Sequence, residues 1–413
     1  MPFLCVKVIK PCVVWEYGLV PIRFIASATK QSNKRESPNI RKRRRPKHQH
    51  PSNFGLSSKE KKALKKKLLL NEKETTNDHA FKELYPWKTK LELAQHLRNT
   101  EVYNNDGLIA LCKPYGIAQV LVNPEGDGSS RSVIQTLNSG GIPDNVPTIR
   151  DTLPLLKELY GVPHLEVIKS TERWSSGLIL LCTNKELTEK VQKCFRRSAS
   201  FEQPALTYWA VTVGLPKPTT IATKVGSTLE YVSNAGKVPV ILKNYSNASV
   251  KKGVVRLSLV EHNALIFNKE TGASLVEVNV QGVHWHFLRV WLSYSYSPIL
   301  GDALYSARVK TVAGRRLKIS PHNLTYYEPQ VIPEPLFSKL ELQPTAVEMI
   351  PCHLHLAKVR LTGFQKDKSD LIISAPPPSH FVWTCRQLGL MTDKDDYTSE
   401  AETKTTLQKE NEG

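Results

Sequence analysis

Apolar residues recur along the chain with two different periods between about residue 106 and residue 390. Short apolar runs that end at turn-forming residues are typical of buried strands, whereas apolar residues three or four positions apart predict helices. The helical pattern is clear in 185–197, where Leu187, Val191 and Phe195 share one face. A second helix is predicted at 153–160. Strands are predicted within 106–120 and at 165–169, 178–182, 205–214, 238–243, 254–260 and 273–280.

The stretch from Pro163 to Asn184 combines a sheet with candidate chemistry. It reads PHLEVIKSTERWSSGLILLCTN, which predicts a strand, a polar turn, a glycine and a second strand. The turn places Glu172, Arg173 and two serines at the end of a rigid sheet, where functional groups are often presented. From these residues alone, an ordinary exposed hairpin is an equal alternative.

The charge balance points to a polyanionic partner. The chain has 413 residues, 40% of them hydrophobic, and 57 basic against 38 acidic residues give a net charge of +19. A protein this basic attracts polyanions, of which nucleic acid is the commonest. The alternative is a basic mitochondrial or ribosome-associated protein without a specific site.

The first 50 residues predict a targeting segment. They contain 12 Lys and Arg but only two acids, Glu16 and Glu36, and apolar clusters alternate with single cations. This composition is typical of a mitochondrial transit peptide and lacks the continuous apolar core of a secretory signal. The RKRRRPK cluster at 41–47 could instead be a nuclear address or a phosphate-binding arm. No stretch of about 18 apolar residues occurs, so we expect no membrane span.

Composition shifts divide the chain into four parts. We expect a transit peptide or basic disordered arm at 1–50, a basic linker and helix at 51–100, a folded domain at 101–390, and a disordered polar tail at 391–413. The basic helix is predicted in KEKKALKKKLLL at 59–70. Seven cysteines without a C-x-x-C pair are expected to be reduced core thiols, and we predict no metal site.

The segment from Ser175 to Leu181, SSGLILL, resembles the second half of the signature of the RluA-type RNA pseudouridine synthases. That signature reads H-R-L-D-x-x-T-S-G before an apolar strand. Aligned on Ser176 and Gly177, the family's nucleophilic aspartate falls on Glu172. The last residues of the signature, Ser176 and Gly177, therefore match the family. Its first residues do not, because the family's His, Arg and Leu are replaced by Lys169, Ser170 and Thr171.

Further segments resemble the same family in the same order. The family's K-P-x-G turn is matched at Lys113, and its K-x-Y-x-A-x-V-x-G strand at Tyr208, with Leu206 in place of the lysine. VHWHFLR at 283–289 resembles G-R-x-H-Q-I-R, and PILGDALY at 298–305 resembles P-I-x-G-D-x-x-Y. The segments at 351–356 and 371–378 resemble a closing helix that begins near L-H-A and a strand that ends in A-P-x-P.

The resemblance implies an α+β pseudouridine synthase fold, with a mixed, mainly antiparallel sheet, flanking helices and a central RNA-binding cleft. It implies that the C1′–N1 bond of uridine is broken and the base rejoined through C5, without a cofactor. Glu172, Tyr208 and Arg289 would be catalytic, with Arg289 as the ion-pair partner of Glu172. Leu288 would form the floor of the uracil pocket. The remaining substrate-binding residues would be Ser176, Gly177, Lys113 and His286.

Two hypotheses follow from the departures. In the first, the chain is a working synthase of the mitochondrial branch with a degenerate signature, acting in the matrix as a monomer on mRNA, rRNA or tRNA. The longer side chain of Glu172 moves the carboxylate by about 1 Å, a shift that can cost about 100-fold in rate. In the second, the fold is an inactive RNA-binding factor that supports RNA processing or ribosome assembly. A basic structural protein of the mitochondrial ribosome would not explain the ordered motifs.

Overall fold

The computed structural model describes residues 79–82, 84–119, 146–232, 236–324 and 329–391. The predicted transit peptide, the basic helix predicted at 59–70 and the polar tail after residue 391 lie outside the described residues. None of the described helices is long and apolar enough to cross a membrane.

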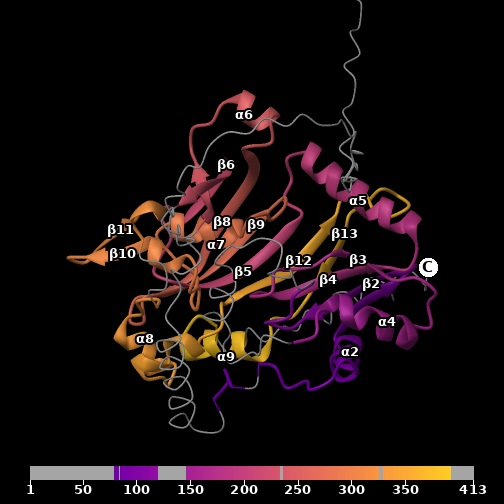
Figure 1. The fold of residues 1–413 in the computed structure, drawn as a ribbon, viewed down its shortest axis with the longest axis horizontal. Coiled ribbons are helices and arrows are strands. Elements are labelled where there is room, and N and C mark those ends of the chain that lie inside the picture. The colour runs from indigo at the N-terminus through magenta and orange to yellow at the C-terminus, as the bar shows by residue number, and fades with distance from the viewer. Residues whose placement is uncertain (1–78, 83, 120–145, 233–235, 325–328, 392–413) are drawn as a thin grey trace, which may run out of the picture. The chain divides into compact units, whose positions relative to one another are not determined.

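A mixed sheet of 11 strands forms the centre of the fold (Figure 1). Its main path runs β1-β2-β4-β12-β5-β9-β8-β6-β7, while β3 pairs with β4 and β13 pairs with β12. Every pair is antiparallel except β4 with β12, which is parallel. The strands are β1 (Glu101–Asn105), β2 (Leu108–Lys113), β3 (Glu166–Lys169), β4 (Ser176–Cys182), β5 (Leu206–Val213), β6 (Thr220–Val232), β7 (Gly236–Leu242), β8 (Arg256–Asn268), β9 (Ala273–Val280), β12 (Leu354–Leu361) and β13 (Leu371–Ser374).

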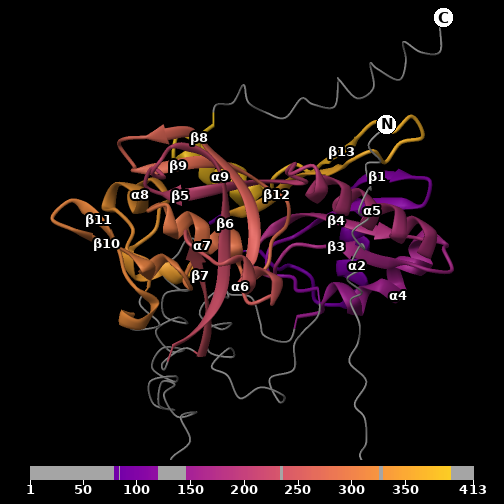
Figure 2. The ribbon, with the colours of Figure 1, turned by 90° about the horizontal axis from the view of Figure 1, so that it is seen from above.

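Helices cover both faces of this sheet, and a small hairpin stands apart from it (Figures 1 and 2). The hairpin consists of β10 (Val309–Val312) and β11 (Arg315–Lys318). The helices that bear on the site are α2 (Lys90–Asn99), α4 (Ile149–Tyr160), α5 (Lys185–Ser200), α6 (Asn247–Lys251), α7 (Phe287–Tyr294), α8 (Glu334–Lys339) and α9 (Ser379–Gln387).

Strand β4 is buried on both faces, which explains its continuous apolar sequence. Leu178 and Leu180 face one core cluster with α5 and α7, whereas Ile179 and Leu181 face another with α2 and α4. Strand β5 separates its side chains in the same way. Tyr208 points into the first cluster, and its neighbours on the other face pack with α8 and α9. Tyr208 therefore shares a face of the sheet with α7.

The structure confirms the predicted α+β sheet and corrects two details. The segment that resembled a helix near L-H-A is strand β12, which lies between β4 and β5 in the centre of the sheet. The packed part of the chain also begins before residue 101. Leu93, Ala94 and Leu97 of α2 are fully buried against α4 and β2, because the apolar face of α2 closes the third core cluster.

The stretch at 215–272, which the sequence left without a role, extends the sheet. Strands β6, β7 and β8 continue the sheet beyond β9, and β7 forms its edge. Figure 2 shows these strands beside α7 on the same side as the β10–β11 hairpin, with α4 and α5 at the other end. The extension therefore adds surface next to α7.

Two buried histidines predict a loss of stability in mild acid. Burial lowers the pKa of His353 and His355 to about 4. Because these folded values lie below the unfolded value of about 6.5, the unfolded chain binds more protons between pH 6.5 and pH 4. Stability is therefore fully present above pH 6.5 and falls as the pH drops toward 4.

We expect His353→Gln, which keeps an N–H donor for Thr384 Oγ1, to flatten this pH dependence. Between pH 7 and pH 5 the variant should lose about 2 kcal/mol less unfolding free energy than the wild type. Urea unfolding at both pH values measures the difference. Equal losses in the two proteins would contradict the assignment of His353 as a buried neutral group.

Candidate active site

The turn that carries Glu172 is fixed by its own backbone. The N–H of Ser175 donates to the carbonyl of Glu172 at 3.2 Å, and the Ser175 hydroxyl donates to the same oxygen at 3.1 Å. Thr171 Oγ1 donates to the carbonyl of Ser175 at 3.3 Å. The side chain of Glu172 is half-buried at the end of β3 and β4. The main chain is thus held in place while the carboxylate can still meet a ligand.

The K-P-x-G loop clamps this turn from the other side. Gly116 N–H donates to the carbonyl of Arg173 at 2.9 Å, and Arg173 Nε donates back to the carbonyl of Gly116 at 3.1 Å. Lys113 Nζ donates to the carbonyls of Ser175 at 2.5 Å, Ile117 at 2.9 Å and Pro114 at 3.1 Å.

Lys113 was expected to contact substrate, but these three bonds occupy all the donors of its ammonium group. Its side chain is 1% exposed. Burial lowers the pKa of Lys113 to about 7, and the charge of Glu172 opposes that shift. The structure therefore gives Lys113 a positioning role, in which it ties the loop to the turn that carries Glu172.

Ser176 and Gly177 hold strands together at the same point. The Ser176 hydroxyl donates to His355 Nδ1 at 2.9 Å, and His355 Nε2 donates to the carbonyl of Ala375 at 3.2 Å. This direction follows from the low pKa of His355, which keeps the ring neutral with its proton on Nε2. Both residues were expected to bind substrate, and the structure shows them buried between β4 and β12.

Gly177 lies where the two strands approach too closely for any side chain. Its φ is +123°, and a Cβ atom there would lie 2.4 Å from the carbonyl oxygen of Leu356. Leu356 is paired with Gly177 on one side and with Tyr208 on the other. The glycine of the motif thus brings β4, the strand that follows Glu172, next to β12. The other neighbour of β12 is β5, which carries Tyr208.

Arg289 is buried in the first turn of α7 and forms its ion pair with Asp302, not with Glu172 as expected. Arg289 Nη2 lies 2.5 Å from Asp302 Oδ1, and the two side chains are 1% and 0% exposed. The same oxygen accepts from the backbone N–H groups of Leu304 at 3.0 Å and Tyr305 at 3.2 Å. Burial acts to lower the pKa of Arg289, but Asp302 outweighs it and holds the pKa above its usual value.

Two donors of Arg289 are left without a partner. Its Nε and Nη1 atoms are buried, and they make no hydrogen bond with any described residue; the same holds for Asp302 Oδ2. A buried guanidinium with idle donors is costly unless a ligand or a neighbouring anion uses them. Arg289 is therefore prepared to receive an acceptor at this position.

The charge of Glu172 reaches the groups around Arg289. Burial raises the pKa of Tyr208, and the negative charge of Glu172 raises it further. The same carboxylate contributes to the raised pKa of Arg289 and acts on Lys113. The charge of Glu172 thus acts on Tyr208, Arg289 and Lys113, which come from three other segments of the chain. Leu288, expected as the pocket floor, is buried in the same core cluster as Tyr208.

His286 and Tyr305 complete the surroundings of Arg289. His286 has a left-handed backbone with φ of 56° immediately before α7, and its Nδ1 lies 3.1 Å from Tyr305 Oη. The Tyr305 ring lies 5.3 Å from the guanidinium of Arg289. Sequence reasoning matched Asp302 and Tyr305 to the motif without giving them a role. Their signal was the PILGDALY segment, but only the fold shows that both contact Arg289.

Two departures from the motif before Arg289, His284 and Phe287, belong to one continuous aromatic row. Phe287 stacks on His284 at 6.1 Å and on Trp291 at 6.3 Å, and Trp291 stacks on Tyr294 at 5.9 Å between ring centroids. Two of these residues bind the sheet extension. His284 Nε2 lies 2.9 Å from Ser227 Oγ on β6, and Trp291 Nε1 donates at 3.0 Å to a histidine of β8, His262.

Comparison with known proteins identifies the class. No family model matches the chain. The mitochondrial mRNA pseudouridine synthase Rpusd3 of Mus musculus is 31% identical over 304 residues, which cover 72% of this chain and 80% of the relative. Its Homo sapiens counterpart RPUSD3 is 28% identical over 316 residues, covering 76% and 83%.

A solved structure gives the same class for the fold. Human RNA Pseudouridylate Synthase Domain Containing 4 superposes with a TM-score of 0.52 at 21% identity, over 73% of this chain and 97% of that one. The fold is therefore that of a pseudouridine synthase. With the identity to the murine protein, the chain belongs to the RluA-type family of RNA pseudouridine synthases, alongside the mitochondrial RPUSD3 and RPUSD4 proteins.

The close approach at Gly177 predicts a large effect for a single methyl group. We expect Gly177→Ala to cost about 3 kcal/mol or more, because the Cβ would overlap the backbone of β12. Gly161→Ala is the matched control. Gly161 also has positive φ, +62°, but no atom lies within 4 Å of the place that a Cβ would take there, so its cost should be about 1 kcal/mol. Equal losses in denaturant unfolding would contradict the packing argument.

The buried ion pair predicts that Asp302→Asn destabilises the fold by about 3 kcal/mol, because it leaves the charge of Arg289 uncompensated. The exposed pair of Lys339 with Glu270, 3.6 Å apart, supplies the control. Glu270→Gln should change the unfolding free energy by less than about 1 kcal/mol. Urea unfolding of both variants checks this, and a loss below about 1 kcal/mol in Asp302→Asn would count against a buried charged pair.

Proposed function

We propose that the chain is an RNA pseudouridine synthase that isomerises uridine to pseudouridine in mitochondrial RNA, with Glu172 as its catalytic carboxylate. The observation that carries the proposal is that Arg289 keeps two buried donor atoms, Nε and Nη1, without a hydrogen bond to any described residue, while the charge of Glu172 acts on both Arg289 and Tyr208. Membership of the family and the net charge of +19 support RNA as the substrate.

The reaction needs a carboxylate, a cation and a surface for the base. The C1′–N1 bond breaks, the uracil turns, and a C1′–C5 bond forms while the proton from C5 is lost and N1 gains one. Glu172 supplies the electron pair that stabilises the sugar during this exchange. Tyr208 and Leu288 hold the uracil, and the free donors of Arg289 donate to the carboxylate of Glu172 and orient it.

Asp302 sets where Arg289 lies, and this position matters for Glu172, which stands in place of the family's nucleophilic aspartate. Because Asp302 and the N–H groups of Leu304 and Tyr305 form one hydrogen-bonded unit, the guanidinium is held on the side of Asp302. A carboxylate that must reach this fixed cation from the turn gains about 1 Å from the added methylene of Glu172. The fixed position of Arg289 on the side of Asp302 then compensates for the longer side chain of Glu172.

The names of the relatives suggest which class of RNA to test first as the substrate. The murine and human proteins are named mitochondrial mRNA pseudouridine synthases. We propose mitochondrial mRNA as the first substrate to test, with the matrix as the place of action and the monomer as the acting unit.

A second candidate function is RNA binding without catalysis. It is favoured by the reactive half of the signature, where Lys169, Ser170 and Thr171 stand in place of the family's His, Arg and Leu. The matching half, Ser176 and Gly177, serves packing and does not require chemistry. The two candidates differ in whether the carboxylate of Glu172 is needed.

Pseudouridine mapping of mitochondrial RNA distinguishes them. In cells that depend on the variant protein at matched levels, we expect Glu172→Gln to lower modification at the target sites by about 100-fold or more, because the carboxylate is lost. Glu172→Asp keeps the charge but withdraws the carboxylate by about 1 Å from Arg289, so it should also lower modification, by about 100-fold. The control is Glu166→Gln, a change of an exposed glutamate on β3. An unchanged map in Glu172→Gln would favour the binding function.

A further inference from the structure

Two long segments of the chain carry basic residues and no aspartate or glutamate. The first, 231–260, runs through β7 and α6, and its cations are Lys237, Lys243, Lys251, Lys252 and Arg256. The second, 303–327, runs through the β10–β11 hairpin, and its cations are Arg308, Lys310, Arg315, Arg316 and Lys318. Surfaces that serve no polyanion usually intersperse both signs of charge.

The fold joins the two segments. Arg308 Nη1 donates to the carbonyl of Pro239 at 2.7 Å, which ties β7 to the residues that lead into β10. Arg316 Nη1 donates at 2.8 Å to the carbonyl of Tyr296, which attaches the hairpin to the chain just after α7. Lys318 and Lys243 are close enough for the charge of Lys243 to add to burial in lowering the pKa of Lys318.

Aromatic rings hold the lysine at the centre of this arrangement. Lys318 Nζ lies 3.6 Å from the ring centroid of Tyr294 and 4.4 Å from that of Tyr296. Such contacts restrict the flexible side chain, so less conformational entropy is lost when an anion binds it. Tyr294 is the last residue of α7, the helix whose first turn carries Arg289. The lysine is therefore linked to the active site through one short helix.

Four exposed cations of these segments have no counter-charge among the described residues. Lys237, Lys243, Arg315 and Lys318 are exposed, and none forms an ion pair with a described residue. The acid that flanks the first segment, Glu230, is 3.4 Å from His322. Cations held near one another without a counter-charge repel, and a phosphate backbone relieves that repulsion and releases its own counterions.

We propose that the basic surface formed by Lys237, Lys243, Arg315 and Lys318 binds the phosphates of the RNA strand that flanks the target uridine. The inference rests on the proposed function for the identity of the polyanion. It gives the extension of the sheet and the β10–β11 hairpin a shared purpose, which is to hold the strand beside α7 while one uridine enters the site.

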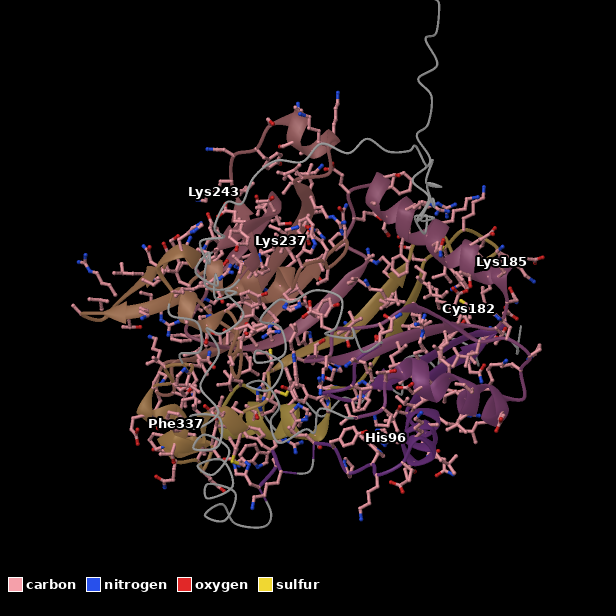
Figure 3. All side chains as sticks on the ribbon, in the orientation of Figure 1. His96, Cys182, Lys185, Lys237, Lys243 and Phe337 are labelled. Atoms are coloured by element: carbon pink, nitrogen blue, oxygen red, sulfur yellow. The ribbon has the colours of Figure 1, made fainter. Side chains whose placement is uncertain are left out.

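The test compares two double variants of the full chain that remove the same charge. Lys243→Gln/Lys318→Gln removes the centre of the basic surface. Lys185→Gln/Lys190→Gln removes two exposed lysines of α5, one of which also contacts an aromatic ring, at 4.0 Å. Figure 3 shows Lys185 at the right edge of the view, away from Lys243 at the upper left. Binding of a fluorescein-labelled single-stranded RNA of mixed sequence is measured by anisotropy over a range of salt concentrations.

We expect the surface variant to bind about tenfold or more weakly at about 0.1 M salt. Its slope of log affinity against log salt should be smaller by about 1.4, since each single-strand phosphate contact contributes about 0.7. The α5 variant should match the wild type. Equal binding by the surface variant and the wild type, equal weakening in both variants, or no RNA binding by the wild type would each overturn the proposal.

Pseudouridine formation, assayed separately, keeps the two claims apart. If the wild type binds RNA through this surface but forms no pseudouridine on any mitochondrial RNA, the proposed function fails and the surface assignment stands. If modification proceeds and the surface variant binds like the wild type, the enzyme assignment stands and the surface assignment fails.

Discussion

The close approach of β4 and β12 at Gly177 is the constraint on which the site depends. Within the described sheet these strands are the hydrogen-bonded join between the half that contains β1 to β4 and the half that contains β5 to β9. The join works only if Gly177 has no side chain, because the backbone of Leu356 occupies that space. Glu172 lies in the turn between β3 and β4 of one half, and Tyr208 lies in β5 of the other, so the join that closes the sheet also links the two parts of the site.

Residues that depart from the family's motifs are not scattered defects. Phe287 replaces the glutamine of the motif and stacks with Trp291 in one row on α7. Trp291 is hydrogen-bonded to β8, and His284, which precedes α7, is hydrogen-bonded to β6. The sheet extension and these substitutions therefore form a single packing unit. That unit holds the face of α7 opposite to Arg289, whose own position is set by Asp302. Arg289 is thus held in place by contacts that the motif does not predict.

The local sequence pattern was sufficient to predict the helices and strands that enclose the site. It could not predict which residues far apart in the sequence contact one another. The turn at Glu172, the two strands beside it and helix α5 follow from apolar spacing and turn residues. Strand β12 was mistaken for a helix because its segment was compared with the family's closing helix, and its own pattern gave no correction, since its first four residues are all buried and do not alternate. The partner of Arg289 could not be read from the sequence, because spacing does not say which of two acids lies nearer in space. Lys113 was assigned to substrate for a similar reason, since only the fold shows three carbonyls around it.

The central claim is that the carboxylate of Glu172 acts on uridine in RNA. The most direct measurement is the release of tritium from RNA that carries [5-³H]uridine, by purified wild-type chain and by Glu172→Ala, with equal RNA binding shown for both. The account predicts that the wild type releases tritium, because pseudouridine formation removes the C5 hydrogen, and that the variant does not. Release at equal rates by both proteins, or none from mitochondrial RNA with the wild type, would contradict it.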